Sequence, residues 1–540
     1  MGLFIIALIV VIGLEIKDRD GISTFIAGLF GMFTITLILT GVLNIFLAPV
    51  AQTPYLITST KKQLRSFEGD YFLLNSDRRI NYLIDTEAGL EMKNELIEKA
   101  LTRATDTRAC EIGDGVLART PAMFREQFPE ADRAFVVCDP RTRAAAGARV
   151  EALLGEAGIE VAEHVLEPDG RMFHADYRYA AEVREAIKAA GVEKDGRKIV
   201  PVAVGSGVVN DLTKLASGEL GIPYMVCATA ASVDGYSSFG AAIRSPEGAK
   251  QTYACPAPRA ILADLDVMRT APKWMAASGF ADLMAKVPAG ADWILAYELG
   301  ATVWHDSSWH TVQDGLKAAI GDPEGVAAMK TEPLTRFVEG LMLGGFAMQD
   351  MQSSRPASGA EHLFSHLLEM RDHTFKGDIV PHGIQVGVFT LFMCRVYEKI
   401  LAFDYSQLDV EACLANWQPL EEQERLGAAA FAGTKFPELG VKAVRAKFAD
   451  RETWRRRLED FKARWPQIRA RLEGQLVPAA EIERRLRVVG APATPEEIGS
   501  SVAASLADVR KTIFMRDRYM ALDFLALTGQ LDDFARASFG

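Results

Sequence analysis

Residues 198–232 read KIVPVAVGSGVVNDLTKLASGELGIPYMVCATAAS, and this stretch decides the class of fold. A β-rich apolar run enters a pair of glycines, a helical segment follows, and a second apolar run comes after it. The same alternation precedes the stretch, with strands predicted over 133–139 and 161–166 and helices over 141–158 and 174–191. Strands that alternate with helices at this spacing are typical of a parallel sheet. The sequence therefore predicts an α/β domain.

Two glycines lie where the predicted strand of this stretch meets its helix. The backbone N–H groups of such a loop approach a pyrophosphate, and the helix dipole favours the negative charge. The third glycine of a full dinucleotide fingerprint is absent, because Asn210 stands in its place. A plain strand-to-helix turn would look similar, so both interpretations stay open for this loop alone. The glycine loop consists of Gly205, Ser206, Gly207, Val208, Val209, Asn210 and Asp211.

A second candidate loop follows the next predicted strand and is rich in small hydroxylic residues. In open α/β sheets, ligands bind beyond the carboxyl ends of the strands, where this loop would lie. An ordinary loop rich in serine and threonine is the alternative. The hydroxylic loop consists of Thr229, Ala230, Ala231, Ser232, Val233, Asp234, Gly235, Tyr236, Ser237 and Ser238.

The composition of the 540-residue chain is that of a folded protein, with 49% hydrophobic and 24% charged residues. This balance excludes disorder as the main property of the chain. A net charge of −11 argues against nucleic-acid binding, which needs a basic surface that meets phosphates. The six cysteines are scattered without a CxxC pair, which fits a reducing compartment better than a disulfide framework or a thiolate zinc site.

The N-terminal segment holds two apolar runs, 2–14 and 25–51, and the second contains no charged residue. A helix that crosses a bilayer needs about 20 apolar residues, so the second run is long enough. We therefore expect residues 1–55 to be a membrane anchor with a membrane-spanning segment, and residues 56–100 to be a linker. Basic residues after the second run predict that the rest of the chain is cytoplasmic and tethered to the membrane. A pair of buried core helices is the alternative.

Four of the eight histidines fall within a short stretch of the chain. His362 and His366 share one face of a predicted helix, and His382 stands just before a second, apolar helix. Asp282 adds a carboxylate inside an apolar helical stretch. One aspartate with two or three histidines is a common ligand set for a divalent metal with an open coordination position. Two partly exposed helical histidines are the alternative, and His373 is interpreted as a solvated loop residue.

Several runs of the sequence together resemble one family. They are GSGVVNDLTKLAS, TAASVDGYSSFGAAI, ADLDV, ASGFADLMAK, RPASGAEHLFSH and PHGIQVGV, with FMRDRYMALDFLALTGQLDDF near the C-terminus. In this order they are similar to the bacterial branch of the sn-glycerol-1-phosphate dehydrogenases, within the dehydroquinate synthase and iron-containing alcohol dehydrogenase superfamily. The resemblance covers roughly residues 100–540 and not the apolar N-terminal segment. It implies a Rossmann-like dinucleotide-binding domain at 101–272 and an all-α metal-binding and substrate domain at 273–540.

The resemblance also implies a role for each candidate residue. The glycine loop would hold the pyrophosphate of NAD(P)(H), and residues 229–232 and Ser238 would line the nicotinamide. Asp139 would meet the adenosine ribose, which favours NADH. Asp234 would contact the substrate as a catalytic residue, and His366 would relay a proton to the substrate oxygen. One divalent metal, zinc or nickel, would be held by Asp282, His362 and His382.

The reaction expected from the resemblance is the reduction of dihydroxyacetone phosphate to sn-glycerol 1-phosphate, in phospholipid biosynthesis, by a homo-oligomer. The metal would polarise the ketone while hydride arrives from the nicotinamide. The substrate phosphate needs a cationic anchor, for which Lys250, Lys286 and Arg355 are candidates. Three alternatives remain: an alcohol or glycerol dehydrogenase with an unphosphorylated substrate, a lyase similar to dehydroquinate synthase, and a non-catalytic membrane-tethered scaffold.

Overall fold

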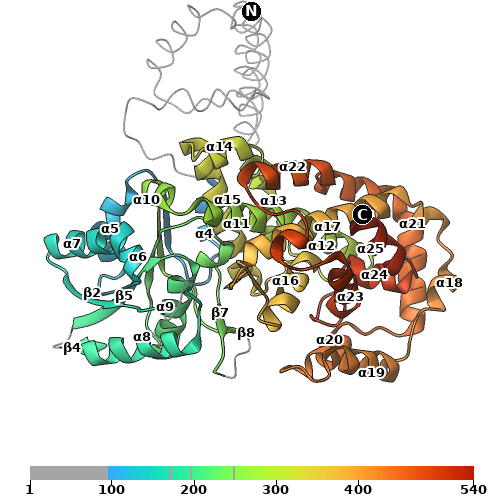
Figure 1. Ribbon diagram of the computed structural model, residues 1–540, viewed down its shortest axis with the longest axis horizontal. Coiled ribbons are helices and arrows are strands. Elements are labelled where there is room, and N and C mark those ends of the chain that lie inside the picture. The colour runs from blue at the N-terminus through green and yellow to red at the C-terminus, as the bar shows by residue number, and fades with distance from the viewer. Residues whose placement is uncertain (1–94, 169–172, 195–196, 247–249, 540) are drawn as a thin grey trace, which may run out of the picture. The chain divides into compact units, whose positions relative to one another are not determined.

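The predicted parallel sheet is present in the computed structural model, which describes residues 95–168, 173–194, 197–246 and 250–539 (Figure 1). Its strands are β1 (Ala109–Gly113), β2 (Ala131–Cys138), β3 (Glu160–Val165), β4 (Glu193–Lys194), β5 (Arg197–Gly205), β6 (Met225–Ala228) and β9 (Ala260–Asp264). They lie in the order β1-β9-β6-β5-β2-β3, and each pairing along this path is parallel. β4 pairs with β5 in the antiparallel sense. The carboxyl ends of the parallel strands therefore share one edge of the sheet.

Side chains of the central strands alternate between two hydrophobic cores, one on each face of the sheet. In β2, Phe135 and Val137 belong to one core, and Val136 and Cys138 belong to the other. The first core also takes side chains from α8 and α9, and the second takes side chains from α5 and α7. These helices are α5 (Thr120–Gln127), α7 (Ala148–Glu156), α8 (Tyr177–Ala190) and α9 (Gly207–Leu220). Because helices cover both faces, the central strands are apolar on both sides.

Helices form most of the described chain after β9, and apart from α10 they extend from the middle to the right of Figure 1, while the sheet lies at the left. Every residue from Ala276 to Met284 in α11 is buried, which explains why this stretch of sequence lacks a polar face. The long helices are α11 (Lys273–Met284), α12 (Lys286–Glu298), α13 (Asp306–Ala319), α15 (Thr331–Met351), α16 (Ala360–Met370), α17 (His382–Ala402), α19 (Leu420–Phe431), α21 (Arg451–Gln475), α22 (Ala479–Val489) and α23 (Val502–Thr512). The predicted domain boundary between residues 272 and 273 stays a prediction.

The described chain also contains shorter helices and two hairpins. The helices among them are α4 (Glu95–Leu101), α6 (Pro140–Thr142), α10 (Leu265–Thr270), α14 (Pro323–Ala327), α18 (Val410–Leu414), α20 (Leu439–Lys447), α24 (Ala521–Leu527) and α25 (Leu531–Phe539). Two antiparallel hairpins are formed by β7 (Ala241–Arg244) with β8 (Lys250–Tyr253), and by β10 (Thr374–Phe375) with β11 (Asp378–Ile379). The second hairpin joins α16 to α17, so the helical part contains one small element that the prediction of an all-α domain omits.

The predicted fold class needs one correction, which concerns the membrane-spanning segment. In the part of the chain that the structure describes, no helix combines the length and the apolar character that crossing a bilayer requires. The long helices α15, α17 and α21 all carry charged side chains within their length, and such groups are costly in hydrocarbon. Residues 1–55, on which the anchor was predicted, and most of the linker 56–100 lie outside the described residues. The architecture is thus an α/β part joined to a helical part.

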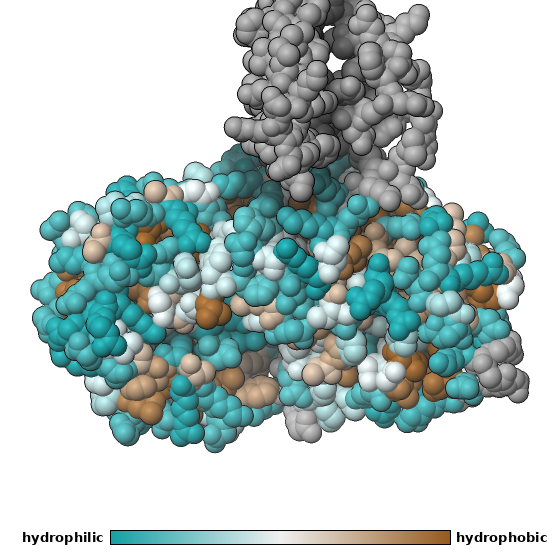
Figure 2. Space-filling view, turned by 180° about the vertical axis from the view of Figure 1, so that it is seen from behind, coloured by the Kyte–Doolittle hydropathy of each residue, from teal (hydrophilic) through white to brown (hydrophobic). Residues whose placement is uncertain are grey.

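The described surface is mainly hydrophilic on the face that Figure 2 shows, with small separate hydrophobic patches. Isolated apolar side chains of this kind are normal on a protein surface. The large apolar side chains that are exposed in the described part are Trp274, Tyr297, Val303, Phe403 and Leu426.

Candidate dinucleotide and metal site

A cavity of about 1200 Å³ lies at the carboxyl edge of the sheet and reaches the facing ends of α16 and α17. Residues that follow β2, β5 and β6 form one wall, and residues of the helical part form the other. β2 and β5 are neighbours, but β3 extends the sheet beyond β2 and β6 extends it beyond β5. At such a switch point the loops diverge and leave a crevice, which is where dinucleotides bind in open α/β sheets.

The glycine loop brings the N-terminus of α9 to this cavity. Ser206 precedes the helix with extended backbone (φ −81°, ψ −173°), and no side chain caps the helix start. The first N–H groups of α9 are therefore available to an anion, which the helix dipole also favours. A Cβ on Gly207 would lie 2.9 Å from Val233 Cγ1, so a larger residue would displace the neighbouring loop. The members of the glycine loop that line the cavity are Ser206, Gly207, Val208 and Asp211.

Asn210, which replaces the third glycine, faces away from the cavity. Its side chain is buried, and its Oδ1 accepts a hydrogen bond from the Tyr224 hydroxyl at 3.0 Å. Tyr224 directly precedes β6, so this contact ties α9 to the neighbouring strand. Val209 is buried in the core, and a Cβ on Gly205 would overlap the Val209 side chain. These three residues of the glycine loop support its position and do not line the cavity.

The residues after β2 and β6 complete this wall. Asp139 follows β2, and its Oδ1 accepts the N–H groups of Arg141 and Thr142 at 2.8 and 3.0 Å. This cap holds the Asp139 carboxylate at the cavity edge. Ala231 does not line the cavity, because its carbonyl packs against Gly279 of α11. The predicted residues that do line it from the hydroxylic loop are Thr229, Ala230, Ser232, Asp234 and Ser238.

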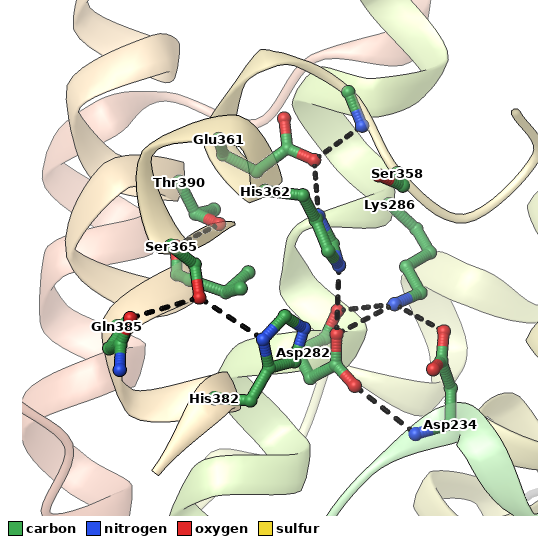
Figure 3. A network of polar contacts seen from close by, with 12 residues as sticks. Asp234, Asp282, Lys286, Ser358, Glu361, His362, Ser365, His382, Gln385 and Thr390 are labelled. Atoms are coloured by element: carbon green, nitrogen blue, oxygen red, sulfur yellow. Dashed lines mark hydrogen bonds and ion pairs between the residues drawn. The ribbon is translucent and has the colours of Figure 1, made fainter. Parts of the chain in front are cut away.

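Asp282, His362 and His382 converge beside the cavity from three helices (Figure 3). Asp282 lies within buried α11, His362 lies in the first turn of α16, and His382 is the first residue of α17. One ligand atom from each lies within 4.8 Å of the others. Nε2 of His362 is 3.3 Å from Oδ1 of Asp282. One carboxylate with two imidazoles is a donor set that suits a divalent transition metal, so these residues fit such an ion.

Two glutamates hold the histidine rings from behind. Nδ1 of His362 is 2.8 Å from Glu361 Oε1, and Nδ1 of His382 is 3.1 Å from Glu369 Oε1. Oε2 of Glu369 also lies 3.2 Å from Nδ1 of His366, which lines the cavity one turn after His362. Carboxylate contacts of this kind fix the ring orientation and leave the second ring nitrogen of each histidine for the site.

The sequence does not indicate that either glutamate orients a histidine. The pattern Ser358-Gly359-Ala360-Glu361 predicts a capping box that starts at the serine. In the structure Gly359 precedes α16, and Glu361 Oε1 accepts the Gly359 N–H at 2.7 Å while it also holds His362. The capping pattern therefore marked a residue that also orients the cluster. Glu369 carries no comparable signal, because its second histidine partner, His382, comes from another helix.

The histidines differ in electrostatic environment. Burial acts to lower the pKa of His362, but hydrogen bonds to Asp282 and Glu361 outweigh it and raise the pKa to about 8. Burial lowers the pKa of His366 to about 3, against the hydrogen bond to Glu369 and with help from the charge of Arg516. Burial acts to raise the pKa of Asp282, yet Lys286 and His362 hold this pKa far below its usual range. Asp282 is therefore ionised and His366 is neutral near pH 7.

Lys286 is fully buried one turn after Asp282. Its Nζ lies 2.7 Å from Asp234 Oδ2 and 3.0 Å from Asp282 Oδ1, and the Asp234 N–H donates to Asp282 Oδ2 at 3.1 Å (Figure 3). Burial acts to lower the pKa of Lys286, but the two carboxylates raise it above its usual value, so the ammonium is charged. Lys286 thus joins the predicted catalytic aspartate to the predicted metal aspartate, and it does not line the cavity as a phosphate anchor.

Arg355, a second predicted phosphate anchor, also does not line the cavity. Arg355 is buried and donates both Nη groups to the Tyr519 carbonyl at 3.1 Å. The side chain of Lys250 lies outside the described residues. Two arginines that were not predicted, Arg516 and Arg518, do line the cavity. They belong to the run FMRDRYM, which carries the family resemblance but has no local pattern that points to a cavity.

Gly383 allows α17 to start against α11. A Cβ at this position would overlap the Ser278 carbonyl, which lies one turn before Asp282. We expect Gly383→Ala to move His382 away from Asp282, to weaken metal binding about tenfold or more, and to cost about 1–3 kcal/mol of unfolding free energy. Metal titration and chemical denaturation measure both effects. Gly474→Ala in α21 is the matched control, since its Cβ would meet no atom within 4 Å; equal behaviour of the two variants would contradict the expectation.

Comparison with known proteins shows which class of enzyme this chain is similar to, and then which family. The family model described as iron-containing alcohol dehydrogenase matches residues 111–272. The chain is 33% identical over 314 residues to glycerol-1-phosphate dehydrogenase (NAD(P)+) of Bacillus subtilis. The aligned region covers 57% of this chain and 78% of that protein. It is 35% identical over 268 residues to the protein of the same name from Pyrococcus horikoshii, covering 48% and 70% of the two chains. A solved structure of maleylacetate reductase from Agrobacterium tumefaciens shares 15% identity at a TM-score of 0.49, over 80% of this chain and 97% of that one.

The chain therefore belongs to the glycerol-1-phosphate dehydrogenase family, within the iron-containing alcohol dehydrogenases. This confirms the resemblance that the sequence runs indicated.

Proposed function

We propose that the chain catalyses the reversible reduction of dihydroxyacetone phosphate to sn-glycerol 1-phosphate with NAD(P)H. The observation that carries the proposal is a single cavity that meets both the N-terminus of α9 and the histidines of the candidate metal cluster. A dinucleotide and a carbonyl substrate must share such a space for hydride to pass between them. The names of the relatives support the choice of substrate.

The sheet order supports an arrangement for the dinucleotide. β2, β5 and β6 are adjacent, so Asp139, the glycine loop and the hydroxylic loop follow one another along the sheet edge. We assign the adenosine ribose to Asp139, the pyrophosphate to the glycine loop and the nicotinamide to the hydroxylic loop. The nicotinamide then lies at the end of the cavity that borders α11, because Ala231 of the hydroxylic loop packs against this helix.

We assign one divalent ion, zinc or nickel, to Asp282, His362 and His382. When bound, such an ion supplies Lewis-acid polarisation of the substrate carbonyl. The chain contributes a carboxylate kept ionised by Lys286 and two imidazoles whose orientation Glu361 and Glu369 hold. Asp234, fixed by Lys286 at the cavity wall, is positioned to contact a substrate hydroxyl.

His366 is the group that we assign to proton transfer. A neutral imidazole whose Nδ1–H is donated to Glu369 leaves Nε2 able to accept a proton from the hydroxyl of glycerol 1-phosphate. In the direction of reduction the steps reverse: hydride passes from the nicotinamide to the carbonyl carbon, and a proton reaches the carbonyl oxygen. NAD(P)H is thereby oxidised to NAD(P)+ and the ketone becomes a secondary alcohol.

The test is a cofactor oxidation assay on the purified chain loaded with zinc or nickel. Dihydroxyacetone phosphate is expected to be reduced with a kcat/KM at least about a hundredfold above that for dihydroxyacetone, because the phosphate supplies charge-assisted hydrogen bonds. The stereochemistry of the product, determined with an enantiomer-specific assay, is expected to be sn-1. Equal rates for the two ketones would contradict the proposal and favour an alcohol or glycerol dehydrogenase.

A further inference from the structure

The segment between α23 and α24 forms the part of the cavity wall that faces the histidines. Arg516, Asp517 and Arg518 all line the cavity. Nη2 of Arg516 lies 3.4 Å from Nε2 of His366. The ring of His366 is 5.7 Å, centroid to centroid, from that of His382. A guanidinium therefore stands directly beside the candidate reaction centre.

Neither arginine forms an ion pair with a carboxylate in the described part of the chain. Arg518 donates from Nη1 to the Ser358 carbonyl at 2.8 Å and from Nη2 to the Ser354 hydroxyl at 2.6 Å. Arg516 contacts the ring of His366 through Nη2. A guanidinium has five N–H donors, so both arginines keep donors for another acceptor. Burial, and after it the charges of Arg516 and Arg355, lower the pKa of Arg518 to about 9, so the guanidinium stays charged near pH 7.

The backbone that carries the two arginines is held in place directly after Arg518. Arg355 donates to the Tyr519 carbonyl, directly after Arg518. Buried Asp292 accepts the N–H of Ala521 at 3.0 Å, and the same carboxylate accepts the Ala360 N–H at the start of α16. The segment is therefore anchored to the helix that carries His362 and His366. A preorganised site of this kind loses little freedom when an anion binds.

The other described cations that line the cavity are placed differently. Arg244 forms an ion pair with Asp372, so its charge is already compensated. Arg141 follows Asp139 at the β2 end of the wall, where the adenosine is assigned. In dihydroxyacetone phosphate a methylene and an ester oxygen separate the carbonyl carbon from phosphorus. The phosphate must therefore lie close to the reacting carbonyl and to His366, beside which Arg516 stands and near which Arg518 follows in the same stretch of cavity wall.

We propose that Arg516 and Arg518, with the Ser354 hydroxyl beside them, bind the phosphate group of the substrate and set the preference for a phosphorylated ketone. This inference rests on the proposed function, because it assigns a subsite to the same substrate. Planar guanidinium groups suit phosphate oxygens because they donate parallel hydrogen bonds.

The test compares Arg516→Met with the unmodified chain. We expect kcat/KM for dihydroxyacetone phosphate to fall about a hundredfold, and to fall at least about tenfold more than kcat/KM for dihydroxyacetone, which has no phosphate group that could lose a partner. Inorganic phosphate is expected to raise the Tm of the unmodified chain and to compete with dihydroxyacetone phosphate, and Arg516→Met is expected to lose both effects. Arg516→Lys keeps the charge without the paired donors, so an intermediate loss is expected.

The outcomes separate this inference from the proposed function. If the unmodified chain does not reduce dihydroxyacetone phosphate, the proposed function fails. If it does, and Arg516→Met retains that activity, the phosphate subsite is overturned. Equal losses for both ketones would show that Arg516 acts only through His366, which also overturns it. Arg518→Lys is the second variant, and Arg510→Met is the control, because Arg510 is exposed and pairs with Asp532 outside the cavity.

Discussion

Replacing His382 by alanine is expected to remove the bound metal and to lower kcat/KM for dihydroxyacetone phosphate by about 10³-fold or more, the scale of a lost Lewis acid. His382 is one of three donors, so its loss leaves only Asp282 and His362 of the described cluster. The backbone of α17 continues through a buried apolar helix that the substitution leaves intact. Metal content by elemental analysis and steady-state kinetics measure the two effects.

A matched control distinguishes loss of a ligand from loss of any histidine. His310 lies on α13, is about half exposed, and contacts Asp306 and Asp314 away from the cavity. His310→Ala is expected to retain both metal and activity. If His382→Ala keeps a full equivalent of metal with unchanged turnover, the assignment of Asp282, His362 and His382 as ligands is wrong. The thermal transition of each variant shows whether the fold persists.

Replacing Lys286 by methionine is expected to cost about 3–5 kcal/mol of unfolding free energy, because it leaves buried carboxylates without their partner. Asp282 is fully buried and Asp234 nearly so, and both now depend on the Lys286 ammonium within 3.0 Å. Activity is expected to fall as well, since Asp234 loses the contact that holds it at the cavity wall. Denaturation of the metal-free chain measures the loss without a contribution from bound ion.

Two further variants test whether the loss of stability in Lys286→Met comes from the unpaired buried charges. Lys188→Met removes an exposed lysine paired with Glu185, and a loss of at most about 0.5 kcal/mol is expected. Asp234→Asn combined with Lys286→Met is expected to be more stable than Lys286→Met alone, because one unpaired buried charge is gone. A double variant as unstable as the sum of the single variants would mean that packing of the lysine stem, and not charge, explains the loss.

Local sequence patterns predicted the sheet and its covering helices well, because the hydrophobic pattern of a strand or helix lies within one short stretch of sequence. The runs at 133–139 and 161–166 and the start of the 198–232 stretch became β2, β3 and β5 with small shifts of their ends. The second apolar run became β6, which ends at Ala228, directly before the hydroxylic loop that lines the cavity. A strand and the loop that follows it have similar composition here, so only pairing with β5 and β9 decides where the strand ends.

For the candidate site, the sequence indicated which kinds of side chain could bind a metal and a dinucleotide. It did not indicate the contacts that hold these side chains in place. The i, i+4 spacing of His362 and His366 and the strand-to-helix glycines are local signals. The contacts that support the site come from Glu369, Lys286 and Arg516. These contacts depend on which helices pack together, and a short stretch of sequence does not contain this information. Lys286 is the clearest case: as a cation near the site it was interpreted as a phosphate anchor, whereas burial between Asp234 and Asp282 makes it an internal counter-ion.

By itself, the sequence determined the α/β and helical character of residues 101–540, the family and the chemical types of the candidate residues, because these follow from periodicity, composition and motif order. Only the tertiary structure decided that Asp282, His362 and His382 meet, that Asn210 supports its loop from behind, and that Arg516 and Arg518 face the cavity. The physical reason is close packing between distant elements: α17 starts against α11 at Gly383 and Ser278, and a carboxylate of Glu369 joins two helices. The membrane span predicted from apolar length has no counterpart among the described helices, where charged side chains interrupt each long helix.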